Sequence, residues 1–181
     1  MANPKPTQLG WTAADFALKG GDGKTHTLAG VRGRKGTLVA FICNHCPYVK
    51  AIIPRLVEEA GALSRIGIGT VAIMPNDTAA YPADSFANMQ AFARQHAFPF
   101  PYVIDDTQQV ARSYGAVCTP DFFGFNASDE LAYRGRLDAS RTTLVPGARR
   151  DLFEAMQLVA DTGHGPAEQM LSVGCSIKWR G

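Results

Sequence analysis

The feature that most constrains the fold is a pair of cysteines placed between a buried strand and a helix. Residues 37–42 read TLVAFI, an almost wholly apolar run that is typical of a central strand buried on both faces. Cys43 and Cys46 follow this run directly, with an asparagine and a histidine between them. Over residues 46–64, apolar side chains recur every three or four positions, which predicts an amphipathic helix. The two cysteines are therefore expected where a strand ends and a helix begins.

This position favours redox chemistry at the two thiols over simple packing. A thiol at a helix N-terminus faces unpaired backbone N–H groups and the positive end of the helix dipole, and both stabilise the thiolate. Because the thiolate is the nucleophile, we expect Cys43 to attack a substrate disulfide and Cys46 to close an intramolecular disulfide. A protonated His45 beside Cys43 would favour the thiolate further. The predicted catalytic residues at the motif are Cys43, His45 and Cys46.

The rest of the chain alternates between strand and helix patterns. Within residues 15–28, two short alternating segments flank a Gly-Gly-Asp-Gly turn, which predicts an N-terminal β-hairpin. The order predicts an α/β fold with a mixed central sheet and helices on both faces. We expect one domain over 1–181, with a core at about 10–160 and a loop-like tail at 163–181. Further strands are predicted at 67–74, 102–104, 121–125 and 130–137, and helices at 83–97, 148–161 and, beginning with acidic residues, 106–114.

Composition excludes several classes of partner and location. Hydrophobic residues make up 46% and charged residues 19% of the chain, which is typical of a globular protein. The formal net charge is only +2 and the basic residues are scattered, so we expect no nucleic-acid partner. Residues 1–7 lack the apolar core of a signal peptide, and the apolar run 38–43 is too short to span a bilayer. We therefore expect no membrane association and a cytoplasmic protein, in which cysteines are seldom permanent disulfides.

A second element is a Thr-Pro pair far from the cysteines in the sequence. Thr119 and Pro120 immediately precede an aromatic stretch that includes Phe122 and Phe123. A proline is allowed at the first residue of a strand, because no ladder hydrogen bond is lost there. Whether this Thr-Pro pair indicates a functional element depends on the fold in which it occurs.

The motif, the helix containing Pro54 and the later Thr119-Pro120 together resemble the thioredoxin-like superfamily over residues 10–160. The hairpin and the stretches NHCPYVKAIIP, TPDFF, YRGRLD and GCSIKW are most similar to the redoxin, or AhpC/TSA-type, peroxiredoxin-like group. That group also resembles the TlpA/ResA thiol-disulfide oxidoreductases. The resemblance implies that Pro120 is cis and that its loop, with Thr119, lies against the cysteine motif and hydrogen-bonds the substrate backbone.

The resemblance also nominates supporting residues around the site. It implies that Cys118 lies near the motif, either as a resolving thiol or as a core residue. Cys175, in the Gly- and Pro-rich tail, either folds back to resolve a disulfide or packs beside Trp179. Arg136 is a candidate for the cationic group that a peroxide-binding site needs, although a surface arginine remains the simpler interpretation.

The chain departs from both standard patterns of this superfamily. If Cys46 takes the peroxidatic position, Val39 and Cys43 stand in place of the usual proline and threonine. Compared with thioredoxin, Ile42 replaces a tryptophan and Thr37 replaces a buried acid. The neighbouring histidine or solvent would then have to carry the proton that the acid normally accepts.

Three functions remain open from the sequence. The favoured one is a thiol-disulfide oxidoreductase that acts on protein disulfides through a Cys43–Cys46 couple. The second is an antioxidant thiol peroxidase acting on hydroperoxides, with Cys46 or Cys43 oxidised first. The third is a copper or zinc carrier that uses Cys43, Cys46 and a histidine. For the favoured enzyme we expect no cofactor, no bound metal, an unidentified thiol as electron donor, and a monomer or homodimer.

Overall fold

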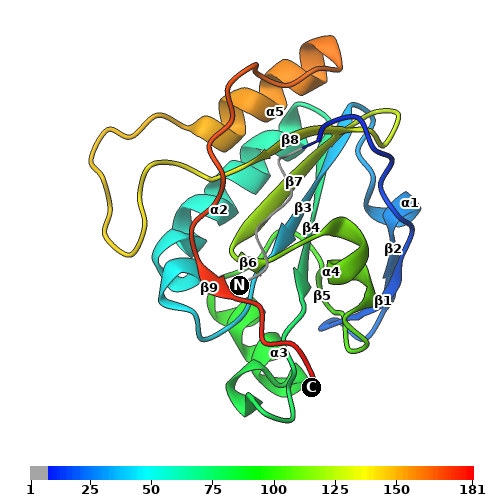
Figure 1. The fold of residues 1–181 in the computed structure, drawn as a ribbon, viewed down its shortest axis with the longest axis vertical. Helices are drawn as coiled ribbons and strands as arrows, with labels where there is room; N and C mark the ends of the chain where they lie inside the picture. Colours follow the sequence, from blue (N-terminus) through cyan, green and yellow to red (C-terminus); the bar gives the residue numbers. More distant parts are fainter. Residues whose placement is uncertain (1–7) are drawn as a thin grey trace.

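A seven-stranded mixed sheet forms the centre of the computed structural model, which describes residues 8–181 (Figure 1). Three central strands run parallel to one another, and every other pairing in the sheet is antiparallel, as the predicted strand–helix alternation followed by a hairpin requires. In spatial order the strands are β2 (Thr25–Thr27), β1 (Ala17–Gly20), β5 (Tyr102–Ile104), β4 (Ile68–Met74), β3 (Gly36–Phe41), β7 (Asp121–Asn126) and β8 (Leu131–Gly135).

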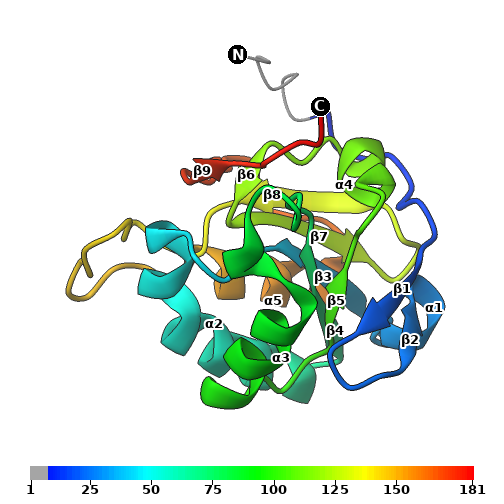
Figure 2. The same ribbon diagram turned by 90° about the horizontal axis from the view of Figure 1, so that it is seen from below.

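Helices cover both faces of this sheet, as predicted (Figure 2). On one face pack α2 (Pro47–Arg65), α3 (Phe86–Gln95) and α5 (Asp151–Thr162). On the other face pack the short helices α1 (Leu28–Val31) and α4 (Gln109–Tyr114). A 3-10 turn, η1 (Pro82–Asp84), precedes α3. The β1–β2 pair is the predicted N-terminal hairpin.

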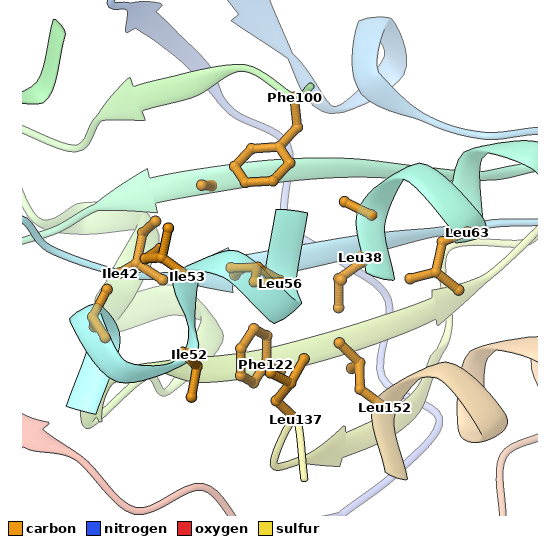
Figure 3. Close-up of a cluster of buried hydrophobic side chains, with 14 of the residues drawn as sticks. Leu38, Ile42, Ile52, Ile53, Leu56, Leu63, Phe100, Phe122, Leu137 and Leu152 are labelled. Atoms are coloured by element: carbon orange, nitrogen blue, oxygen red, sulfur yellow. The ribbon is translucent and has the colours of Figure 1, made fainter. Parts of the chain in front are cut away.

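Strand β3 contributes side chains to both halves of the hydrophobic core. Leu38 and Ala40 belong to the cluster under α2, where Leu38 lies near Leu56 (Figure 3). Val39 and Phe41 point into the opposite cluster, because successive side chains of a strand alternate between faces. Every residue of β3 is buried, which confirms the prediction of a strand covered on both faces. Burying each large side chain contributes about 1.5–3 kcal/mol, so the end of β3 is a rigid support for the cysteine motif.

The C-terminal tail differs from its prediction. The prediction of loop is wrong for β9 (Cys175–Ser176), which pairs antiparallel with β6 (Cys118–Thr119) in a second, two-stranded sheet. Gly174 permits this pairing, because a Cβ there would collide with the carbonyl oxygen of Thr119. No periodic pattern marks a two-residue strand, so only the folded chain shows it.

The start of α4 also differs from its prediction. The helix begins at Gln109 rather than at Asp106, and no acidic residue lies in its first turn. Instead, Asp105 Oδ2 accepts a hydrogen bond of 2.8 Å from the backbone N–H of Ala111. Asp105 therefore supports the helix from the preceding turn and not from within it.

Two expectations concern the membrane and the first residues. Across residues 8–181, no helix is both long enough and apolar enough to cross a bilayer. The expectation that residues 1–7 carry no targeting signal lies outside the described residues.

Candidate active site

The two motif cysteines lie at the junction of β3 and α2, where the sequence places them. Ile42 continues the sheet by donating its backbone N–H to the carbonyl of Ile73 at 3.0 Å. Cys46 is the N-cap of α2, and its carbonyl accepts the first helical hydrogen bond, 3.0 Å from the Lys50 nitrogen. Cys43 is 1% exposed and Cys46 is fully buried. Both sulfurs of the dithiol are therefore covered by the segments around them.

The Thr119-Pro120 loop closes one side of the dithiol. The Thr119–Pro120 peptide bond is cis. The hydroxyl Oγ1 of Thr119 lies 3.3 Å from Cys43 Sγ, and the carbonyl oxygen of Thr119 lies 3.3 Å from Cys46 Sγ. One residue thus contacts both sulfurs, which confirms that the Thr-Pro pair and the motif belong to one site.

The two thiols differ in acidity. A hydrogen bond from Cys43 lowers the pKa of Cys46 to about 4, and hydrogen bonds from Cys175 and from the Val49 backbone N–H act in the same direction. The hydrogen bond to Cys46, then burial, then the charge of Asp84 raise the pKa of Cys43. The pKa of Cys46 therefore lies below that of Cys43, so that of the two a thiolate forms first on Cys46. The sequence pattern favours the thiolate at Cys43 instead, because it says nothing of the groups around each sulfur.

A buried carboxylate organises the side of the site next to Cys43. Asp84, which is fully buried, accepts hydrogen bonds of 2.8 Å from the Asn44 backbone N–H and from the Asn76 amide. Its Oδ2 also lies 2.7 Å from Nδ1 of His45, a salt-bridge distance when the imidazole is protonated. The His45 ring stacks on Tyr81, with ring centroids 6.1 Å apart, and its side chain is 31% exposed. His45 is thus held at Nδ1 and partly open to solvent.

Sequence reasoning missed three of these polar residues. Asp84 comes from η1, Asn76 follows β4, and Tyr102 begins β5. The hydroxyl of Tyr102 donates a 2.8 Å hydrogen bond to Asn44 Oδ1, which fixes the residue between the cysteines. No local pattern marks them. The only available signal is that parallel strands end at one edge of a sheet, where polar residues gather.

One cluster at the site has donor atoms suited to a metal ion. A sulfur of Cys43, a ring nitrogen of His45 and a carboxylate oxygen of Asp84 lie within 4.8 Å of one another. Thiolate, imidazole and carboxylate are all zinc ligands. The carrier set expected from the sequence was Cys43, Cys46 and a histidine, and the structure substitutes Asp84 for Cys46.

The candidate resolving cysteines occupy different positions. Cys175 Sγ lies 2.9 Å from Cys46 Sγ, so the tail cysteine reaches the motif. Trp179, the alternative neighbour, instead carries the guanidinium of Arg112 over its ring at 4.3 Å. Cys118 Sγ lies 3.5 Å from the carbonyl oxygen of Pro120, and burial raises the pKa of Cys118 to about 12. Cys175 is in sulfur contact with the dithiol, whereas Cys118 faces the backbone of its own turn.

Arg136 is not directed at the cysteines. Its Nε lies 2.8 Å from Asp151 Oδ2, an ion pair at the start of α5. The side chain lines a groove beside Pro120, together with Tyr48 and Asp138. The arginine expected to support an anion is therefore already paired with a carboxylate.

Comparison with known proteins finds similarity over most of the chain. A model of the AhpC/TSA family matches residues 9–145. Thiol-disulfide oxidoreductase ResA from Geobacillus thermodenitrificans (strain NG80-2) is 29% identical over 122 residues, which are 64% of this chain and 62% of that protein. The aligned part is thus less than two thirds of ResA.

Solved structures show the same architecture. An uncharacterized conserved protein from Geobacillus kaustophilus has a TM-score of 0.90 and 41% identity, covering 96% of this chain and 93% of that chain. The thioredoxin domain of a thiol-disulfide oxidoreductase from Bacteroides vulgatus has a TM-score of 0.65 and 16% identity, covering 84% and 97% of the two chains. At the lower identity the likeness shows the fold alone, and that fold is thioredoxin-like, as the sequence predicts.

Proposed function

Since this chain belongs to the AhpC/TSA family, we propose that it is a thiol-disulfide oxidoreductase whose Cys43–Cys46 dithiol reduces protein disulfides. The observation that carries the proposal is the pair of thiols at the N-terminus of α2, both in contact with Thr119 of the cis Thr119-Pro120 loop. The similarity to ResA, a thiol-disulfide oxidoreductase by name, supports the same activity.

The first step is the attack of Cys43 on the substrate. Cys43 attacks one sulfur of the substrate disulfide, and its proton passes to His45 or to solvent, because a Cys46 thiolate with a pKa of about 4 is too weak a base to take it. A bond forms between Cys43 and the substrate sulfur, the substrate disulfide breaks, and the other substrate sulfur leaves as a thiolate. Thr37, a neutral residue, stands in place of a buried acid that would otherwise accept this proton.

The second step resolves the mixed disulfide. The Cys46 thiolate attacks the sulfur of Cys43, and the departing substrate thiolates take up protons from His45 or from solvent. The Cys43–Cys46 bond forms, and the second substrate sulfur leaves, so that the substrate is reduced by two electrons and the dithiol is oxidised by two. The proposal includes a cytoplasmic setting and a thiol donor that returns the disulfide to the dithiol.

A thiol peroxidase is the second candidate, and the acidity of Cys46 favours it. A pKa of about 4 makes Cys46 a thiolate at neutral pH, and Cys175 lies in position to resolve an oxidised Cys46. One observation weighs against this function. Arg136 is paired with Asp151 instead of facing the sulfur.

An insulin-reduction assay with dithiothreitol as donor tests the proposal. We expect Cys43→Ser and Cys46→Ser each to lower the catalysed rate by about 100-fold or more, because each removes a sulfur that forms a covalent intermediate. Cys118→Ser, a cysteine that contacts neither motif sulfur, is the matched control and should keep the wild-type rate. Catalysis that survives in the Cys43→Ser, Cys46→Ser double variant would refute the proposal, and fast hydroperoxide turnover lost only in Cys46→Ser would reverse the ranking of the two functions.

A further inference from the structure

The C-terminal tail holds a third thiol against the dithiol. Cys175 in β9 is paired in register with Thr119 in β6, the residue that contacts both motif sulfurs (Figure 1). Its Sγ lies 2.9 Å from Cys46 Sγ. A peptide that offers a disulfide to the motif must also approach beside Thr119. The tail therefore occupies, from within the chain, the backbone edge next to the dithiol.

This position is fixed by many contacts along the tail. The backbone N–H of Ile177 donates to the Val117 carbonyl at 3.1 Å, and Ile177 is 3% exposed. The next backbone N–H, that of Lys178, donates to Asn76 Oδ1 at 2.9 Å. Further on, Arg180 donates its backbone N–H to the side chain of Gln108 at 2.8 Å. Hydrogen bonds to three separate segments hold Cys175 where it is, so its contact with Cys46 is part of the fold.

We propose that Cys175 is a third redox thiol, which takes the disulfide from Cys43–Cys46 by exchange at Cys46. This inference rests on the proposed function, which generates the Cys43–Cys46 disulfide. In the exchange, the Cys175 thiolate attacks the Cys46 sulfur. The Cys46–Cys175 bond forms, the Cys43–Cys46 bond breaks, and Cys43 leaves as a thiolate that takes up the proton released by Cys175. No electrons enter or leave the chain, so the step needs no further oxidant or reductant.

The exchange moves the disulfide toward the surface. Cys43 and Cys46 are buried, whereas Cys175 is only half-buried. An external thiol reaches the less buried sulfur of Cys175 more readily than the motif sulfurs, and it can attack that sulfur in the Cys46–Cys175 disulfide. The exchange also returns Cys43 to its reduced form before the external donor acts.

The charges around Cys175 make the step depend on the state of the dithiol. Burial, then the hydrogen bond to Cys46 and the charge of Cys46, raise the pKa of Cys175 to about 11, while Lys178 lowers it. Once Cys46 is in a disulfide it has neither the charge nor the hydrogen bond. The pKa of Cys175 then falls, and its thiolate becomes more abundant at the moment when there is a disulfide to attack.

Cys118 is the matched control for this role. It lies on the same two-stranded sheet, opposite Ser176 and adjacent to Thr119. Successive residues of a strand point to opposite sides, so Cys118 faces away from the sulfurs that Thr119 contacts. Cys118 is thus a second thiol on the same two-stranded sheet that lacks the contact with Cys46.

Peptide mapping after limited oxidation tests the proposal. The reduced full-length protein is oxidised with one equivalent of diamide, alkylated, and digested with trypsin. Cys43 and Cys46 share the peptide 36–50, Cys175 lies in 151–178, and Cys118 lies in 113–134. We expect wild type and Cys118→Ser to yield a cross-link between 36–50 and 151–178, joined at Cys46, with Cys43 alkylated. In Cys175→Ser the disulfide should stay within 36–50.

One further variant and one further measurement test the same step. Gly174→Ala retains Cys175 but forces the tail from Thr119, and it should lose most of the cross-link. Reduction of the oxidised protein by glutathione should be roughly tenfold slower in Cys175→Ser than in wild type, because the remaining disulfide is buried. Far-ultraviolet circular dichroism verifies that each variant is folded.

The outcomes separate this inference from the function on which it rests. If wild type still reduces insulin but confines its disulfide to 36–50 and leaves Cys175 open to alkylation, the third-thiol role is wrong and the oxidoreductase proposal stands. If insulin reduction is insensitive to Cys43→Ser and no disulfide forms in 36–50, both are wrong.

Discussion

The two sides of the dithiol are built from opposite kinds of groups. Beside Cys43 lies a buried carboxylate, Asp84, whose charge helps to keep that thiol protonated. Around Cys46 lie Cys43, Cys175 and the first turn of α2, which lower the pKa of that thiol, together with the carbonyl oxygen of Thr119. Spacing alone makes the two cysteines look alike. The difference shows that the neighbours of each sulfur decide which one carries the charge.

The two sides are physically connected through one side chain. The amide nitrogen of Asn76 donates to Asp84, and its oxygen accepts the backbone N–H of Lys178 in the tail. The buried acid and the tail that carries Cys175 therefore share a hydrogen-bonding partner. A substitution that alters the hydrogen bonds beside Cys43 should therefore also affect the tail beside Cys46. Substitutions around the two sulfurs can test this connection.

Removing the carboxylate of Asp84 should have the largest effect. Asp84→Ala leaves the Asn44 backbone N–H and the Asn76 amide without their acceptor in a buried place, at about 1–3 kcal/mol for each. Asp84→Asn is the matched variant that retains the shape and removes the charge, and it should lower the pKa of Cys43. Urea unfolding measures the first effect. Equal stability of Asp84→Ala and wild type would show that the carboxylate does not organise this side.

Replacing His45 should shift the redox balance by a smaller amount. A ring nitrogen of His45 lies within 4.8 Å of the Cys43 sulfur, and a protonated imidazole favours thiolate, which stabilises the reduced dithiol over the disulfide. We expect His45→Pro to be more reducing by about 30 mV, equivalent to about 1.4 kcal/mol for a two-electron couple. Equilibration with glutathione buffers gives the potential. A variant no more reducing than wild type would show that His45 does not set the potential.

Deleting the hydroxyl of Tyr102 should have the smallest effect. Tyr102→Phe loses one hydrogen bond to Asn44 Oδ1, worth about 1 kcal/mol, and retains the packing of the ring. Thermal unfolding should show a slight fall in the stability of this variant. The insulin assay should show a change in turnover of less than about threefold. A complete loss of turnover would mean that Tyr102 takes part in the chemistry directly.

Much of the site was accessible to sequence reasoning because it is local. The run TLVAFI, the two cysteines and the helical period after them are contiguous, and each has a physical meaning on its own. The structure places Cys43 and Cys46 at the end of β3 and the start of α2, as that pattern predicts. Thr119 and Pro120 were reachable only through the resemblance, because nothing within their own segment points to the motif.

The rest of the site depends on pairing between distant segments. Asp84 lies in η1, after β4, and contacts His45, which lies between β3 and α2. Cys175 contacts Cys46 across 129 positions of sequence. Neither residue lies in a periodic pattern, and β9 is too short to have one. The largest cause of the unequal pKa values is the interaction between Cys43 and Cys46 themselves, and Cys175 in the tail and Asp84 in η1, which the sequence does not place there, act in the same direction.

The most direct test of the central claim is a pH titration of the ultraviolet thiolate absorbance of the reduced protein. The unequal pair predicts one thiolate that persists at neutral pH and is lost only as the pH falls toward about 4, the pKa of Cys46. Cys46→Ser should lose this absorbance at neutral pH, while Cys43→Ser, whose hydroxyl still donates to Cys46, should retain it. The reverse pattern, a neutral-pH thiolate lost in Cys43→Ser and retained in Cys46→Ser, would contradict the assignment of the charge to Cys46.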